Sequence, residues 1–160
     1  MSLIDTEAPK RFRFDYRGMH RYLLRLPGFG SRKVFGEQET VVSVLNCLRD
    51  VAQEHRFDVY AYCFLPAELV MIVRGKDDEA RLKEFLSAFR AASSSAIAAK
   101  PGHSLWKKKY LERVLRKTED TGRAVAEVFE LPVKAGLAKT AAEYPLQGSF
   151  VFAGEEKRRR

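Results

Sequence analysis

The sequence predicts an α+β fold in which helices pack on an antiparallel sheet, in a ferredoxin-like arrangement. Short apolar runs and helical stripes alternate along the chain in the order βαββαβα. Two consecutive strands are separated only by a tight turn, which makes them antiparallel neighbours. The chain has 160 residues, of which 46% are hydrophobic, so it can bury the core of one domain.

The first half of the chain contains the patterns of one helix and three strands. A short apolar run at 20–26 ends where Pro27 to Gly30 mark a loop. Between residues 38 and 55, apolar side chains from Val41 to Ala52 recur at helical spacing and predict one buried face. The next predicted strands are 57–65 and 69–73, joined at Pro66 and Ala67.

A second helix is predicted over 77–99. Its acidic start, Asp77 to Glu79, complements the helix dipole, and Pro101 with Gly102 ends it. The residues at core spacing are Leu82, Phe85, Leu86, Phe89 and Ala96.

One more strand and one more helix complete the predicted order. The strand covers 110–115. The helix covers 119–131, with Thr118 as its N-cap and Pro132 as its stop.

Charge and composition narrow the classes of function. Lysine and arginine number 29 against 21 acidic residues, a formal net charge of +8 that favours polyanionic partners such as nucleic acid. No apolar run approaches the roughly 20 residues that span a bilayer, so we expect a soluble, cytoplasmic protein. We expect Cys47 and Cys63 to be buried thiols, because they lack metal-ligand spacing.

The segment 61–73, Ala-Tyr-Cys-Phe-Leu-Pro-Ala-Glu-Leu-Val-Met-Ile-Val, carries the most specific pattern. It resembles a motif of the REP-associated tyrosine transposases, a branch of the IS200-like, single-tyrosine HUH transposases. The resemblance runs from about Tyr16 to Phe152. It also includes segments 18–25, 32–35, 105–116, 131–137 and 144–149. We therefore predict one domain over 16–152, with a basic lead-in at 1–15 and a charged tail at 153–160.

The resemblance implies a ferredoxin-like fold, hairpin or single-stranded DNA as partner, a divalent metal in active relatives, and a homodimer. In the family two histidines flank one apolar residue on a strand and hold the metal. Residues two apart on a strand project to the same side, so this spacing suits chelation. The matching positions here are Glu68 and Val70, and valine has no lone pair to offer a metal. The sequence therefore predicts no metal cofactor.

The nucleophile of the family is also missing. Its catalytic tyrosine lies five residues before a proline, and counting back from Pro132 gives Glu127. A phenolate forms a stable phosphotyrosine ester, whereas a carboxylate would form a labile acyl phosphate. Two further family positions are altered: an asparagine before the proline is Leu131, and a lysine–glutamine pair in the long helix is Arg90–Ala91. Together these changes predict a domain that has lost strand cleavage.

Nucleic-acid binding is the property that we expect to persist. Cations alternate with aromatic rings after residue 105, a pattern that neutralises phosphates while a ring stacks on a base. The candidate binding residues are Arg90, Trp106, Lys107, Lys109, Arg113 and Arg116. The alternative for this run is a solvated basic face, with Trp106 and Tyr110 packed in the core or at its rim.

Two other classes of function stay open. Glu68 and Glu127 face each other across the old site if the resemblance holds, and paired carboxylates can bind Mg²⁺ for phosphodiester hydrolysis. The chain can also be a decayed remnant or a protein-interaction module that does not bind nucleic acid.

Overall fold

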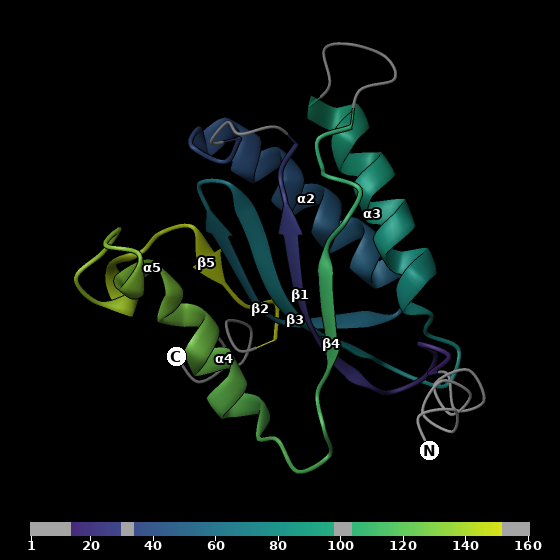
Figure 1. The fold of residues 1–160 in the computed structure, drawn as a ribbon. Helices are drawn as coiled ribbons and strands as arrows, with labels where there is room; N and C mark the ends of the chain where they lie inside the picture. The colour runs from purple at the N-terminus through teal and green to yellow at the C-terminus, as the bar shows by residue number, and fades with distance from the viewer. Residues whose placement is uncertain (1–13, 30–33, 98–103, 152–160) are drawn as a thin grey trace, which may run out of the picture.

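The computed structural model describes residues 14–29, 34–97 and 104–151. Its strands form one antiparallel sheet in the order β4-β1-β3-β2-β5 (Figure 1). The elements are β1 (Arg21–Pro27), α2 (Gln38–Glu54), β2 (Phe57–Leu65), β3 (Glu68–Gly75), α3 (Leu82–Ile97), β4 (Leu111–Val114), α4 (Thr121–Phe129), α5 (Leu131–Lys134), the 3-10 helix η1 (Ala141–Glu143) and β5 (Gln147–Gly148). The predicted α+β fold is confirmed.

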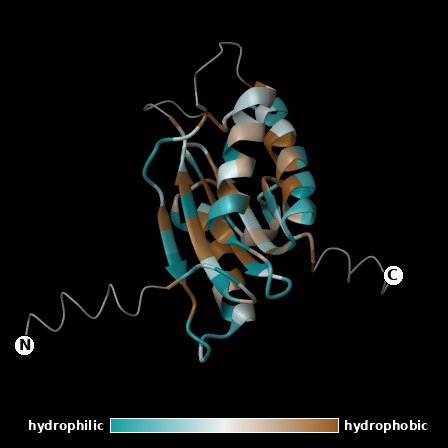
Figure 2. Cartoon of the chain, turned by 90° about the vertical axis from the view of Figure 1, so that its right-hand side faces the viewer, coloured by the Kyte–Doolittle hydropathy of each residue, from teal (hydrophilic) through white to brown (hydrophobic). Residues whose placement is uncertain are grey.

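The main core lies between one face of the sheet and the helices α2 and α3. Strand side chains alternate between faces, so Tyr22, Leu24 and Leu26 of β1 all point into this core. The helices contribute stripes that include Leu48 and Phe89. In Figure 2 the strands are largely hydrophobic, while polar and apolar residues alternate around the helices. The stripe predicted for 38–55 is therefore the buried face of α2.

The opposite face of the sheet carries α4, which packs on β2 and β3. Val125 and Val128 of α4 meet Cys63, Val70 and other small apolar residues of these strands in a second buried cluster. The strands β1 and β4 lie to one side of α4 on the same face (Figure 1). This offset leaves room for a groove between α4 and the β1–β4 edge of the sheet.

The start of the second helix differs from the prediction. α3 begins at Leu82, whereas Asp77 to Glu79 form a turn. The Asp77 side chain accepts from the backbone N–H of Glu79 and pairs with Arg56, so its carboxylate stabilises the turn instead of a helix end. Ala96 is exposed, and the predicted helix end near Ala99 lies outside the described residues.

The last predicted helix is also shorter than expected. α4 is capped by Asp120, which accepts from the backbone N–H of Arg123, so Thr118 is not the N-cap. Pro132 lies within the first turn of α5, where a proline is tolerated, and the chain bends at Glu130 instead. The two-residue strand β5, which pairs with β2, and the turn η1 were not predicted. In the part of the chain described here, no helix is long and apolar enough to cross a membrane.

Candidate functional site

Hydrogen bonds from Arg21 of β1 hold the start of α4 against the sheet. The Arg21 guanidinium donates to the carbonyl of Glu119 and the hydroxyl of Thr121 at 2.7 Å each, and to the carbonyl of Arg116 at 2.7 Å. The Glu119 carboxylate in turn accepts from Arg113 at 2.9 Å and from the Arg116 backbone N–H at 2.7 Å. These bonds lower the pKa of Glu119 to about 2. The turn before α4 is thus fixed by charge-assisted hydrogen bonds.

A groove of about 230 Å³ lies between α4 and the sheet, and we call it the α4 groove. Its floor is apolar and its rim is charged. The lining residues are Leu23, Arg25, Val70, Ile72, Arg113, Ala124, Glu127, Val128, Leu131 and Lys134. The positions that match the family nucleophile and one family metal ligand, Glu127 and Val70, therefore do meet in one hollow.

Glu68, the other position of the family metal pair, is held by an arginine. Arg25 donates from Nε to Oε1 at 3.2 Å and from Nη2 to Oε2 at 2.7 Å, a bidentate pair. Both side chains are about one third exposed, at 37% and 27%. This pair raises the pKa of Arg25. The register explains the contact, since Arg25 lies opposite Val70 and Glu68 lies two residues away, on the same face.

The residues at these positions do not fit a divalent metal. Val70 is 1% exposed and packs in the apolar cluster under α4. Both carboxylate oxygens of Glu68 accept hydrogen bonds from Arg25. A guanidinium beside the carboxylate repels a dication. Among the described residues, no group of three or more His, Cys, Asp or Glu side chains is arranged to hold a metal ion. Glu68 lines a different hollow from Glu127, so the rebuilt carboxylate site has little geometric support.

Cys63 lies next to this site and has an unreactive environment. It is fully buried opposite Val70, and Cys47 is partly buried. Burial, with a smaller contribution from the Glu68 charge, raises the pKa of the Cys63 thiol to about 12. The expected buried thiols are confirmed for Cys63 and only in part for Cys47.

We expect the Cys63 thiol to react about a thousandfold slower with an alkylating reagent in the folded protein than in the unfolded chain at pH 8. The reason is that only the thiolate attacks, and its fraction falls tenfold for each unit of pKa. The rate is measured in a Cys47→Ser variant, with and without denaturant. Equal rates in the two conditions would contradict the buried position.

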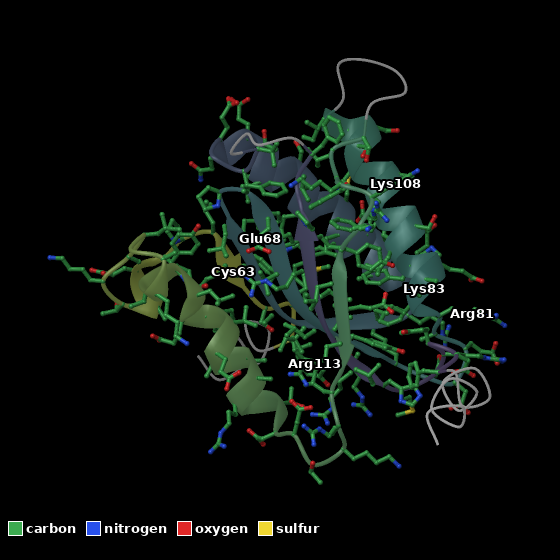
Figure 3. The ribbon with its side chains drawn as sticks, viewed as in Figure 1. Cys63, Glu68, Arg81, Lys83, Lys108 and Arg113 are labelled. Carbon is green, nitrogen blue, oxygen red and sulfur yellow. The ribbon has the colours of Figure 1, made fainter. Side chains whose placement is uncertain are left out.

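The candidate nucleic-acid residues divide between the two sides of the sheet. Arg113 lines the α4 groove, and Arg116 lies in the turn before α4. Arg90 lies on α3 and donates to the carbonyl of Lys107 at 2.8 Å. Figure 3 shows Lys83 and Lys108 along α3, with Arg113 near the α4 side of β4. Residues 107–110 precede β4 instead of belonging to it, so strand alternation does not set the directions of the lysines.

Lys109 lies between these groups. It lines a shallow hollow at the β4 edge, which we call the edge hollow, together with Arg25, Pro27, Glu68, Tyr110, Leu111 and Glu112.

Trp106 is not a surface residue. It is 2% exposed, its indole N–H donates to the Ser93 hydroxyl at 2.8 Å, and its ring packs near Phe35 and Phe89. The expectation that this ring stacks on a base is therefore wrong, and the core alternative holds. Periodicity could not place it, because Trp106 enters the core through an isolated bridge to Gly28 and not through a regular strand.

Sequence reasoning also missed Arg25 and Lys134 as site residues, and it included Tyr110 in the basic run without naming it among the binding residues. Arg25 is 43 residues from its partner Glu68, and only the β1–β3 register brings the two together. Lys134 reaches the α4 groove because the chain bends between α4 and α5. The sequence held one indication of this role for Arg25. Side chains alternate between the two faces of β1, and this alternation places Arg25 on the face opposite the main core.

Comparisons with known proteins agree on the fold. No protein-family model and no curated protein matches the sequence. The chain is similar to a solved structure of a REP-associated tyrosine transposase bound to a REP hairpin, with 17% identity, a TM-score of 0.75, and 92% of this chain and 86% of that one covered. It is also similar to a protein from Deinococcus radiodurans R1 that is provisionally named a transposase, with 19% identity, a TM-score of 0.51, and 67% and 85% coverage. This chain has the fold of a REP-associated tyrosine transposase.

Proposed function

We propose that this chain is a transposase-like DNA-binding protein that holds single-stranded or hairpin DNA without cutting it. The observation that carries the proposal is the likeness, over 92% of the chain, to a transposase solved with a DNA hairpin. The net charge of +8 supports a polyanionic partner. The cations Lys107, Lys109, Arg113 and Arg116, with Arg90, are the proposed phosphate contacts.

The proposed loss of cleavage rests on what occupies the α4 groove. Cleavage by this type of enzyme needs an ion to polarise the phosphate and a phenol to attack it. The groove instead presents the apolar Val70 at a metal-ligand position and the carboxylate of Glu127 at the nucleophile position. Glu68 is neutralised by Arg25. The groove can therefore attract a phosphate at its rim but offers no group suited to breaking the ester.

The proposal has three further parts. The binding unit is the single domain over 16–152, the protein acts in the cytoplasm where DNA is accessible, and it forms a homodimer, as the family resemblance implies.

The test is a binding and adduct assay on hairpin DNA. We expect the protein to shift a labelled DNA hairpin in a native gel. We expect no band that survives denaturation as a protein–DNA adduct, with or without millimolar Mn²⁺. The Lys107→Ala/Lys109→Ala/Arg113→Ala variant should lose at least tenfold in affinity, since each cation neutralises a phosphate.

A matched control separates local contacts from net charge. Arg49→Gln/Lys76→Gln/Lys139→Gln removes the same three charges from exposed positions on α2, after β3 and after α5. It should bind almost as well as the parent. A hairpin that does not bind at all, or an adduct through any tyrosine of the parent protein, would overturn the proposal.

A further inference from the structure

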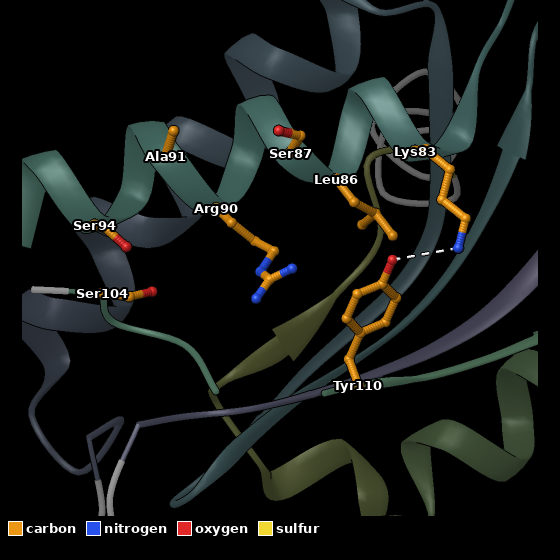
Figure 4. Close-up of a pocket in the computed structure, with 8 residues that line it drawn as sticks. All are labelled: Lys83, Leu86, Ser87, Arg90, Ala91, Ser94, Ser104 and Tyr110. Carbon is orange, nitrogen blue, oxygen red and sulfur yellow. Dashed lines mark hydrogen bonds between the residues drawn. The ribbon is translucent and has the colours of Figure 1, made fainter. Parts of the chain in front are cut away.

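A second groove runs along α3 on the other side of the sheet from α4, and we call it the α3 groove. It has a volume of about 460 Å³. Figure 4 shows the residues that line it: Lys83, Leu86, Ser87, Arg90, Ala91, Ser94, Ser104 and Tyr110. The α3 members recur at helical spacing, so one stripe of the helix forms a wall. Arg90 and Ala91 of this stripe match altered family positions, but neither they nor its other residues line the α4 groove.

The α3 groove is lined mainly by small side chains, and its exposed lining is polar and apolar in similar measure. Ser87, Ala91, Ser94 and Ser104 carry no bulky side chain, and Leu86 is 1% exposed, so no large aliphatic side chain projects into the groove. A protein partner would need an apolar anchor at the centre of its contact. An elongated, hydroxyl-lined groove suits a sugar–phosphate backbone better than it suits an apolar side chain.

Cations and an aromatic ring surround the α3 groove. The Arg90 guanidinium lies 5.2 Å from the centre of the Tyr110 ring, and the Lys83 ammonium lies 5.6 Å from the same centre. Lys107 and Lys108 are exposed beside Arg90, whose Nη2 donates to both of their carbonyls. Against these charges stand Glu112, which pairs with Lys83, and the exposed Glu84 of α3. The balance around the groove is positive.

The three hollows form a continuous series. Tyr110 lines both the α3 groove and the edge hollow, and Arg25 lines both the edge hollow and the α4 groove. A path therefore leads from α4, over the β4 edge, to α3. Lys109 lies in its middle section.

We propose that a single strand of DNA follows this path, leaving the α4 groove, crossing the β4 edge at Tyr110 and continuing along α3. The inference rests on the proposed DNA-binding function and adds a second binding surface on the opposite side of the sheet. From Lys83 to Ser94 the helix rises about 16 Å, which is long enough to lie beside two or three phosphates of an extended single strand. Tyr110 is partly exposed and lies beside Lys83 and Arg90, so it is the ring that a base would contact at this crossing.

The test compares a DNA hairpin with the same hairpin carrying an oligo(dT) tail of about 12 nucleotides, a length within the usual range for single-strand sites. Tails are placed on the 5′ or the 3′ end. In the parent protein we expect one of the two tails to raise affinity about tenfold. The variant Ser87→Glu/Ala91→Glu puts two negative charges on the groove wall, at exposed helical positions where glutamate is well tolerated. It should lose the gain from the tail, measured for each variant as the ratio of its affinity for the tailed hairpin to its affinity for the hairpin alone, because the two glutamates also stand near Arg90.

Two control variants test whether negative charge in the α3 groove is what removes the gain from the tail. Ser87→Gln/Ala91→Gln adds the same bulk without charge and should keep most of the gain. Asn46→Glu/Gln53→Glu adds two charges to exposed positions of α2 and should keep all of it.

The possible outcomes separate this inference from the proposed function. If the hairpin alone fails to bind, the proposed function fails. If the hairpin binds but neither tail adds affinity, or if the gain persists in Ser87→Glu/Ala91→Glu, the path along α3 is wrong while the proposed function stands.

Discussion

Replacing Trp106 by alanine is expected to lower the free energy of unfolding by about 4 kcal/mol, which is about a thousandfold in the folding equilibrium. The indole is one of the largest fully buried side chains, and it lies between the rings of Phe35 and Phe89. Its removal leaves a cavity and takes the donor from the Ser93 hydroxyl. Urea denaturation at equilibrium measures the loss.

A Trp106→Phe variant separates the contribution of ring packing from that of the hydrogen bond to Ser93. Phenylalanine keeps most of the packing but not the N–H group, so we expect a loss of about 1 to 2 kcal/mol. If Trp106 were instead a stacking platform for DNA, the alanine variant would unfold at the parent's urea midpoint and bind hairpins more weakly. That pattern would place the residue at the surface and contradict the structure.

Raising the salt concentration from about 50 to 200 mM is expected to weaken hairpin binding about 500-fold. Each phosphate that a cation neutralises adds about −0.9 to the slope of log affinity against log salt on duplex DNA, so five contacts give about −4.5. The five proposed cations are Arg90, Lys107, Lys109, Arg113 and Arg116. Fluorescence anisotropy over a series of salt concentrations gives the slope.

The salt dependence of binding also tests how much each cation contributes to phosphate binding. Arg113 shares its guanidinium with Glu119, and a partner already bound reduces what it gives to a phosphate. Arg113→Gln is therefore expected to change the slope by less than Lys107→Gln, whose parent side chain is exposed beside α3. Equal changes would show that the Glu119 pair opens on binding. A total slope near zero would exclude phosphate contacts as the source of affinity.

The sequence was a good guide to the fold because most of its signals are local. The stripes of α2 and α3 and the apolar runs of β1 to β3 each lie within one element, so each could be recognised from neighbouring residues. The predicted helix ends were wrong where a residue is compatible with two different local structures. Asp77 can start a helix or close a turn, and its pairing with Arg56 across 21 residues decided for the turn. Pro132 can stop a helix or begin one, and here it begins α5.

The candidate site was predicted less completely because its contacts are distant in sequence. The substitutions at residues 68, 70 and 127 are visible in the sequence, but the arginine that binds Glu68 is not. Tyr110 was placed in a strand, although its role in joining two hollows depends on the loop before β4. The α3 groove was not predicted, because its other wall comes from the segment before β4.

The Arg25–Glu68 pair also bears on how this scaffold can evolve. A histidine introduced at position 68 would leave the guanidinium of Arg25 without its carboxylate, and that charge would repel the dication that the histidine is meant to bind. Under the proposed function, a single histidine at position 68 is therefore not enough to create a metal site on this fold. A variant that neutralises position 25 before the ligands are introduced is the one expected to bind the ion. An ion pair of modest strength can in this way decide the order in which substitutions must be made.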